Sequence, residues 1–180
     1  MNTQKNTNKS QATKAFLETE RLLLREMTQN DFCALYAVLS DSETMRFYPH
    51  PFDEAQVKRW IDNNIERYAV FGFGLWAVVL KSSGEVIGDC GITMQSINGL
   101  IKPEIGYHIR KDLQRRGYAK EAASACRDWA FTYTPFRTLY SYMKKANTAS
   151  RATAESIGMS FAFEYTDESS QAVAVYAVNR

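Results

Sequence analysis

The residues with the clearest potential for chemistry form a short basic segment with one glycine. The segment reads Gln114, Arg115, Arg116, Gly117, Tyr118 and Ala119, and Lys120 follows it. The residues before it are typical of a strand, and the residues after it are typical of a helix. At the start of a helix the backbone N–H groups lack partners, and together they carry roughly half a positive charge. The segment therefore predicts a site for a pyrophosphate group.

This segment does not by itself identify the ligand. It lacks the Lys-Ser/Thr pair of a P-loop and the three glycines of a dinucleotide-binding fingerprint. A solvated basic turn that caps a helix is one alternative, and a nucleotide-binding loop is another.

Two ionisable residues, Glu104 and His108, precede the segment on the predicted strand. Two positions separate Glu104 from Gly106 and Gly106 from His108, so all three should face one side of a sheet. A carboxylate or an imidazole at such a place could accept a proton from a substrate. The alternatives are a solvated or ion-paired glutamate and a structural histidine. The other histidine, His50, lies between two prolines and is expected only to shape a loop.

The elements that must position these residues follow from periodicity and from capping residues. Helices are predicted for residues 31–39, 53–68, 118–133 and 148–156, and strands for residues 21–25, 75–80, 85–94, 103–110, 137–144, 160–165 and 172–178. A polar turn is predicted for residues 96–100. Because helices alternate with antiparallel hairpins, we expect a single α/β (α+β) domain rather than a doubly wound parallel sheet.

Composition limits the partners that can be expected. The chain has 180 residues, and its net charge is only +2, which gives no argument for binding nucleic acid. No apolar run approaches the roughly 20 residues needed to span a bilayer, so no membrane segment is expected. Residues 1–15 are polar and are predicted to form a disordered tail, followed by a domain at residues 16–180.

The three cysteines, Cys33, Cys90 and Cys126, form no CxxC motif. Each lies among apolar or small residues, so we expect buried free thiols rather than a disulfide framework. This usage fits a reducing cytoplasm.

Several motifs, taken in order, resemble the GNAT superfamily of acyl-CoA N-acyltransferases. They are Glu104-Ile105-Gly106-Tyr107, the run from Leu113 to Ala122, Asn147-Thr148-Ala149-Ser150 and Ile157-Gly158-Met159. Residues 18–25 are similar to the opening of the branch that acetylates ribosomal-protein N-termini (RimJ/RimL-like), and residues 76–78 and 86–88 match its central hairpin. The resemblance extends from about residue 17 to residue 178 and implies a mixed, mostly antiparallel sheet of about seven strands with about four helices.

The resemblance implies acetyl-CoA as co-substrate and no metal. Backbone amides of residues 114–120, here called the glycine segment, would hold the pyrophosphate. These residues are Gln114, Arg115, Arg116, Gly117, Tyr118, Ala119 and Lys120. Gly117 would let the backbone approach closely, because it has no Cβ. The strand that carries Tyr107, His108 and Ile109 would splay from its neighbour and pair with the pantetheine arm. Asn147 would hydrogen-bond that arm from the other side.

The resemblance also implies roles in catalysis. Glu104 would act as a base through water, in a direct attack of the acceptor on the acyl group within a ternary complex. Many relatives use a tyrosine acid at the position of Ala154, so Ser150 or a water is expected to assist the leaving thiol instead.

The acceptor would be a primary amine, on a protein N-terminus or a small molecule. Tyr48, Phe73 and Trp76 are expected to line its site, and the protein is expected to be a monomer or a homodimer. A non-catalytic acyl-CoA sensor or scaffold remains the alternative function.

Overall fold

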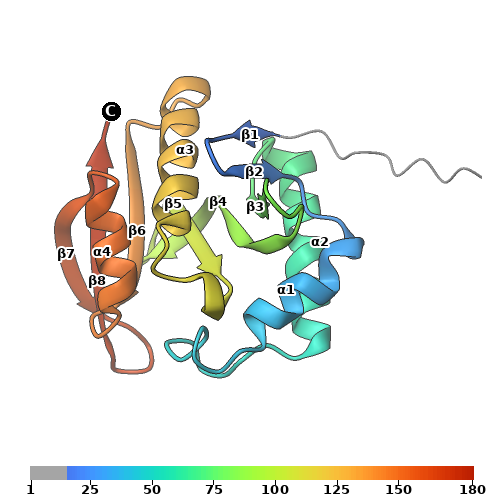
Figure 1. Cartoon of the computed structure of the whole chain (residues 1–180). Helices are drawn as coiled ribbons and strands as arrows, with labels where there is room; N and C mark the ends of the chain where they lie inside the picture. Colours follow the sequence, from blue (N-terminus) through green and yellow to red (C-terminus); the bar gives the residue numbers. More distant parts are fainter. Residues whose placement is uncertain (1–15) are drawn as a thin grey trace, which may run out of the picture.

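The computed structural model describes residues 16–180, and the tail predicted at residues 1–15 lies outside the described part. Its centre is one eight-stranded sheet in the order β1-β2-β3-β4-β5-β6-β8-β7 (Figure 1). The strands are β1 (Leu17–Glu18), β2 (Leu22–Arg25), β3 (Leu75–Leu80), β4 (Val86–Ile97), β5 (Leu100–Ile109), β6 (Thr138–Lys144), β7 (Ser160–Thr166) and β8 (Ala172–Asn179). The predicted class is confirmed. About seven strands were expected, and the additional strand is the two-residue β1, which pairs with β2.

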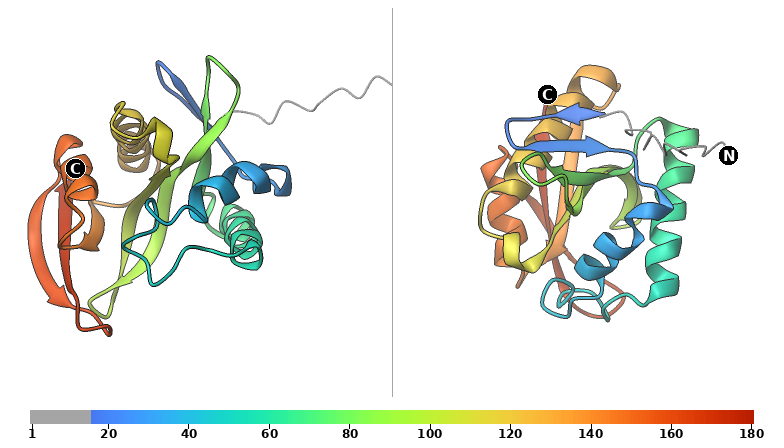
Figure 2. Two further views of the ribbon diagram at one scale, coloured as in Figure 1. Left: turned by 60° about the horizontal axis from the view of Figure 1, so that its bottom comes forward. Right: turned by 45° about the vertical axis from the view of Figure 1, so that its right-hand side comes forward.

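Within residues 16–180, four α-helices cover the two faces of the sheet (Figures 1 and 2). They are α1 (Phe32–Leu39), α2 (Glu54–Phe71), α3 (Tyr118–Tyr133) and α4 (Thr148–Ser156). Helices α1 and α2 lie on one face, and α3 and α4 lie on the other. Two short 3-10 helices, Gln29–Asp31 and Lys111–Leu113, precede α1 and the glycine segment.

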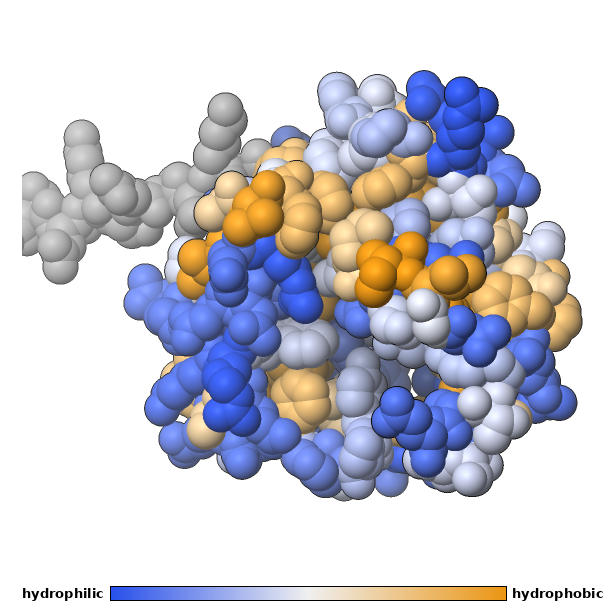
Figure 3. All heavy atoms as spheres, turned by 180° about the vertical axis from the view of Figure 1, so that it is seen from behind, coloured by the Kyte–Doolittle hydropathy of each residue, from blue (hydrophilic) through white to orange (hydrophobic). Residues whose placement is uncertain are grey.

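The core consists of two apolar clusters, one on each face of the sheet. Under α3, the small buried side chains Ala122, Ala123, Cys126 and Ala130 let the helix approach the strands closely. Under α1 and α2, the other cluster includes Leu35, Leu39, Val57, Ile61 and Leu75. On the outside, Figure 3 shows apolar groups separated by polar side chains on the face opposite to that of Figure 1.

Capping residues set the ends of the helices. Asp53 accepts a hydrogen bond of 2.7 Å from the Gln56 backbone and starts α2. Gly72, at φ 74°, ends α2 in the left-handed conformation. The helix therefore continues to Phe71 and not only to residue 68, because the chain has no stop signal before this glycine.

The long hairpin of β4 and β5 extends further than the sequence pattern indicated. Both strands continue to a two-residue turn at Asn98 and Gly99, which have φ values of 50° and 75°. This is the conformation of a type I′ turn, which an Asn-Gly pair favours. The hairpin therefore carries β5 from Leu100 to Ile109 in continuous register with β4.

The sheet opens between β5 and β6. These two strands are the parallel neighbours in the sheet, and their register contains the single pair Glu104–Tyr140. The Ser141 hydroxyl donates a hydrogen bond of 3.1 Å to the Ile105 carbonyl at this point. Beyond it, the end of β5 is paired with β4 alone within the described sheet. The open edge is the splay that the resemblance implied.

The cysteines differ in part from expectation. Cys90 and Cys126 are buried free thiols with their Sγ atoms 3.6 Å apart, whereas Cys33 is exposed. Cys33 is not among the buried residues of α1, which are Leu35, Val38 and Leu39, so its apolar neighbours in sequence did not imply burial. None of the helices within residues 16–180 has the length and apolar character needed to cross a membrane.

Candidate active site

A cleft of about 1620 Å³ opens where β5 and β6 separate. Its walls come from β5, the glycine segment, the start of α4, the loop before α2 and the turn between β7 and β8. Most of the residues predicted for the site border it, namely Tyr48, Glu104, Tyr107, His108, Ile109, Gln114, Arg115, Gly117, Tyr118, Ala119, Lys120, Asn147 and Ser150. The fold therefore gathers segments that are more than 100 residues apart in the sequence.

Three predicted residues do not border the cleft. Trp76 is fully buried and stacks on Phe16, with ring centroids 4.5 Å apart. Phe73 packs edge-on against Trp129 at 6.2 Å, on the α3 side of the sheet. These aromatic residues are part of the core, so the structure gives no support to the expectation that they line an acceptor site. Arg116 also lies outside the cleft walls.

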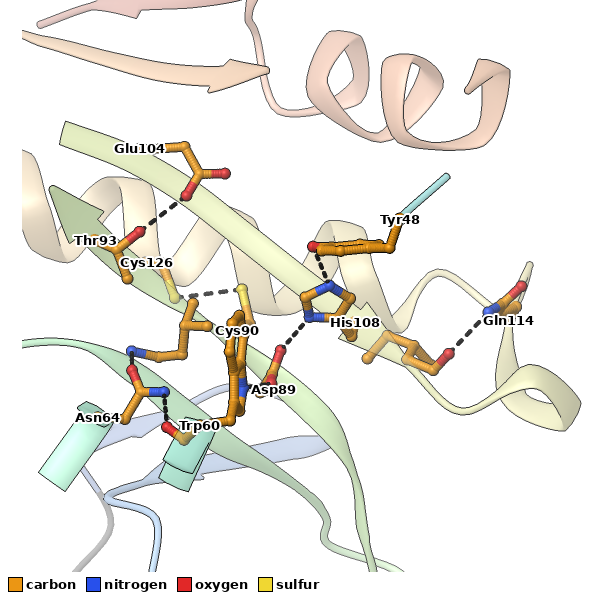
Figure 4. A network of polar contacts seen from close by, with 12 residues as sticks. Tyr48, Trp60, Asn64, Asp89, Cys90, Thr93, Glu104, His108, Gln114 and Cys126 are labelled. Atoms are coloured by element: carbon orange, nitrogen blue, oxygen red, sulfur yellow. Dashed lines mark hydrogen bonds and ion pairs between the residues drawn. The ribbon is translucent and has the colours of Figure 1, made fainter. Parts of the chain in front are cut away.

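Glu104 is a buried carboxylate at the point where the sheet opens. Its Oε2 accepts a hydrogen bond of 3.0 Å from the Thr93 hydroxyl on β4 (Figure 4). Burial raises the pKa of Glu104 to about 7, although the hydrogen bond from Thr93 and the nearby His108 each lower it. A carboxylate with this pKa can both accept and release a proton near neutral pH.

His108 lies on the same face of β5 and has two hydrogen-bond partners. Its Nδ1 lies 2.7 Å from Asp89 Oδ1, and its Nε2 lies 2.8 Å from the Tyr48 hydroxyl (Figure 4). Asp89 is fully buried, and its Oδ2 accepts a hydrogen bond of 2.8 Å from the Trp60 indole. The sequence did not point to Asp89 or Trp60. The available signal was an aspartate inside an apolar strand, because a fully buried aspartate is rare unless it is paired.

The glycine segment has an unusual backbone. Arg115 has a φ of 62°, and Gly117 has a φ of 84° and is the N-cap of α3. Left-handed residues in a turn before a helix direct successive N–H groups to one side, which suits an anion. Gln114 ties the segment to β5, since its Nε2 donates a hydrogen bond of 2.8 Å to the Ile109 carbonyl.

A charged clamp from the turn between β1 and β2 holds the same segment. Glu121, in the first turn of α3, accepts hydrogen bonds from Thr19 Oγ1 at 2.6 Å and from Arg21 Nε at 2.7 Å. Arg21 also donates to the Arg116 carbonyl at 3.0 Å, and its guanidinium lies 4.5 Å from the centre of the Tyr118 ring. Burial raises the pKa of Glu121, but the hydrogen bonds from Thr19 and Arg21 outweigh this effect and lower it overall.

We expect Glu121→Gln to weaken the binding of acetyl-CoA without changing the chemistry. The substitution removes the charge from a bond to Arg21, an interaction worth about 1–3 kcal/mol, and part of that loss should loosen the glycine segment. The KM for acetyl-CoA should rise by about threefold to tenfold, with kcat nearly constant. Asp128→Asn, an exposed change on the same helix, is the matched control. An unchanged KM for acetyl-CoA in Glu121→Gln would show that the clamp does not shape the segment.

The opposite wall of the cleft is the start of α4. Asn147 caps this helix, since its Oδ1 accepts a hydrogen bond of 3.1 Å from the Ser150 backbone. The Tyr107 hydroxyl lies 3.1 Å from Ser150 Oγ and donates to the Ser150 carbonyl at 2.8 Å. Ala154 is fully buried and does not border the cleft, so this position would not present a side chain to a bound ligand.

Comparison with known proteins agrees with this geometry. A family model described as an acetyltransferase (GNAT) domain matches residues 21–160. The uncharacterized protein YkkB of Bacillus subtilis (strain 168) is 35% identical over 149 residues, which are 82% of this chain and 87% of YkkB.

Solved structures share the fold. An acetyltransferase from Agrobacterium tumefaciens str. C58 has a TM-score of 0.79 at 30% identity, with 91% of this chain and 94% of that chain covered. RimL, a ribosomal L7/L12 alpha-N-protein acetyltransferase in complex with coenzyme A, has a TM-score of 0.76 at 17% identity, with 92% and 98% covered. The match of the family model to most of the chain, together with the open sheet and its glycine segment, shows that this protein belongs to the GNAT acetyltransferase family.

Proposed function

We propose that this protein is an acetyl-CoA-dependent N-acetyltransferase that transfers the acetyl group directly to a primary amine in a ternary complex. The observation that carries the proposal is the buried Glu104, with a pKa of about 7, at the point where β5 and β6 part. A proton acceptor is thereby placed beside an open strand edge, and both face one cleft.

The residues around the cleft fit acetyl-CoA as the donor. The left-handed turn at Arg115 and Gly117 offers main-chain amides to a pyrophosphate. At the open edge of β5, Tyr107 and the Ile109 N–H offer backbone groups to the amides of a pantetheine arm, whereas the Ile109 carbonyl already accepts the hydrogen bond of Gln114 and the His108 backbone faces β4. Asn147 borders the cleft from the other side. RimL, which shares the fold, is a coenzyme A complex, in keeping with this arrangement.

Glu104 accepts the proton that the acceptor nitrogen must lose when its bond to the acetyl carbon forms. An α-amino group, with a pKa of about 8, needs less help than a lysine side chain at about 10.4, and the difference is about 3 kcal/mol. As the carbon–sulfur bond breaks, the leaving thiolate takes up a proton from solvent water. Ser150, whose hydroxyl lies 3.1 Å from that of Tyr107, is the group we assign to assist it. The acceptor class is therefore a primary amine, with a protein N-terminus favoured over a lysine side chain.

The full chain incubated with acetyl-CoA and a panel of amines tests the proposal. The panel contains peptides with free N-termini, Nα-blocked lysine peptides and small primary amines, and mass spectrometry detects the acetylated products. We expect acetylation of at least one acceptor, matched by release of coenzyme A. Calorimetric binding of acetyl-CoA without any product would support a non-catalytic sensor instead. A folded protein that shows neither binding nor product would overturn both functions.

A further inference from the structure

Beside the open edge, β4 and β5 place three cross-strand pairs in a row on the face toward α2. The register pairs Thr93 with Glu104, Gly91 with Gly106, and Asp89 with His108. The two outer pairs are joined by side-chain hydrogen bonds, of 3.0 Å for Thr93 and Glu104 and 2.7 Å for Asp89 and His108. The middle pair has no side chains. The start of β3 covers this pair, because an added Cβ at Gly91 would lie 2.0 Å from the Gly74 carbonyl oxygen and one at Gly106 would lie 3.4 Å from Leu75 Cδ2. The Glu104 carboxylate and the His108 imidazole therefore lie on one face of β5, and both border the cleft (Figure 4).

Asp89, on β4, fixes the orientation of the His108 ring. The side chain of Asp89 is completely buried, and its two oxygens are used separately by His108 Nδ1 and Trp60 Nε1. Three elements, β4, β5 and α2, therefore meet at one carboxylate. A buried carboxylate with two donors is costly to remove, since each donor would lose its partner. The hydrogen bond between Glu104 and Thr93 does not involve Asp89, His108 or Trp60, so the bonds of Asp89 have a separate role.

Tyr48 connects the same ring to the loop before α2. Its hydroxyl lies 2.8 Å from His108 Nε2 and its ring packs edge-on against Phe52 at 5.9 Å, while the residue as a whole is 40% exposed. Burial raises the pKa of Tyr48, so the phenol stays protonated over the working pH range. The loop that carries Tyr48 (residues 45–52, here called the acceptor-side loop) is thereby fastened to the strand that carries Glu104.

We propose that Asp89, His108 and Tyr48 form a positioning unit for the acceptor. Asp89 orients the His108 ring, and the ring holds Tyr48 and the acceptor-side loop beside the part of the cleft that Glu104 borders, where the amine would approach. This inference rests on the proposed acetyltransferase function. It predicts that the unit governs the acceptor half of the reaction and leaves the binding of acetyl-CoA unaffected. The side-chain hydrogen bonds of the three residues join them to one another and to Trp60, and none of these bonds reaches the glycine segment or the clamp.

The charges around His108 support the orientation. Burial lowers the pKa of His108, but the charge and hydrogen bond of Asp89 outweigh this, with a further contribution from Glu104, so the pKa is raised above its ordinary 6.5. The titratable groups that face the ring are Asp89 from β4, Glu104 from β5 and Tyr48 from the loop, while α2 contributes the neutral indole of Trp60. When the ring is protonated, it donates to both Asp89 and the Tyr48 oxygen. The Tyr48 proton is then free to face the cleft.

Nuclear magnetic resonance of the histidine rings tests the unit without any substrate. The chain has two histidines, so His50→Gln leaves the signals of His108 alone. In that background we expect a protonated Nδ1 and a titration above pH 6.5, and Asp89→Asn should move the titration below that of the parent. A His108 that titrates at its ordinary value, with both tautomers populated, would overturn the proposal. Because no acceptor is present, this result is independent of whether the protein is an acetyltransferase.

Steady-state kinetics test the consequence for the acceptor. Tyr48→Phe removes only the hydroxyl, and we expect it to raise the KM for the amine by about fivefold to tenfold, the effect of one hydrogen bond. The KM for acetyl-CoA should stay within about twofold of the parent. Asp89→Asn should act in the same direction. Tyr133→Phe and Asp128→Asn, both exposed on α3, are the matched controls.

The two experiments distinguish the possible failures. If Tyr48→Phe leaves the amine KM unchanged, or raises the KM for both substrates equally, the positioning role is overturned. If Asp89→Asn fails to fold, the proposal is still tested by the amine KM of Tyr48→Phe and by the titration of His108 in the His50→Gln protein. If His108 titrates as expected but no amine is acetylated, the arrangement of the three residues stands and the proposed function fails.

Discussion

Replacing Glu104 by glutamine is expected to lower kcat/KM for the amine by about two to four decades. Glutamine keeps the shape of the side chain and can still accept the hydrogen bond from Thr93, which is 3.0 Å long in the parent protein. It cannot accept the proton of the attacking amine, so the loss falls on the chemical step. The binding of acetyl-CoA, measured by calorimetry, should remain within about threefold of the parent.

The pH profile gives an independent check on the same residue. Because the pKa of Glu104 is raised to about 7, the parent enzyme should lose activity as pH falls through 7 and the carboxylate becomes protonated. Glu104→Gln should lack the inflection near pH 7 and keep only the titration of the acceptor amine, which has a pKa of about 8 for an α-amino group. Glu66→Gln, on the exposed side of α2, is the matched control and should keep both the rate and the inflection. A Glu104→Gln variant that retains the parent rate and the parent profile would exclude Glu104 as the base.

Replacing Gly91 by alanine is expected to cause a large loss of stability. A Cβ at Gly91 would lie 2.0 Å from the Gly74 carbonyl oxygen and 2.8 Å from the Leu75 Cα. Both obstacles are backbone atoms, and the Gly74 carbonyl also accepts the hydrogen bond of Ile92 N–H at 3.1 Å. Strands β3 and β4 would have to separate, so we expect the free energy of unfolding to fall by about 3 kcal/mol or more.

Gly84→Ala provides the contrast. Gly84, in the turn between β3 and β4, has a φ of 72° and nothing within 4 Å of an added Cβ. The substitution there should cost only the strain of a left-handed alanine, about 1 kcal/mol. Urea unfolding of both variants at equal protein concentration measures the difference. If Gly91→Ala is no less stable than Gly84→Ala, the close approach of β3 to β4 does not exist in solution.

Much of the fold was predictable because its signals are local. The limits of α3 and α4 follow from a glycine that permits a left-handed N-cap at residue 117 and from the capping side chain of Asn147. The start of α2 follows from the capping box at Asp53. The same kind of local signal, the Asn98-Gly99 pair, would have placed the turn between β4 and β5, whose strands extend further than the polar pattern of residues 96–100 indicated.

The candidate site was predictable only in part. That Glu104 and His108 share a face follows from the two-residue period of a strand. Their partners do not follow from it, because Thr93 and Asp89 are opposite them only through the register of the hairpin. Trp60, on α2, reaches Asp89 only through the packing of the helix on the sheet.

The aromatic residues predicted for the acceptor site also show that sequence alone does not place a side chain. Tyr48 and Trp76 were equally good candidates for an acceptor wall, yet Tyr48 borders the cleft and Trp76 is enclosed between the sheet and α3. Both residues are aromatic, and the residues next to them in the sequence do not show which of the two borders the cleft. What separates them is which face of the sheet each one meets, and a single sequence carries no direct record of that.

The sequence alone determined the order of the elements, the turn chemistry before α3 and the position of Glu104, the carboxylate that we propose as the base, because each depends on residues within a few positions of one another. The tertiary structure decided where the sheet opens, which side chains meet Glu104 and His108 there, and how burial raises the pKa of Glu104 to about 7. These properties depend on segments that are distant in the sequence and that together exclude water. Removing water from around a carboxylate makes its charged form less stable, which raises its pKa.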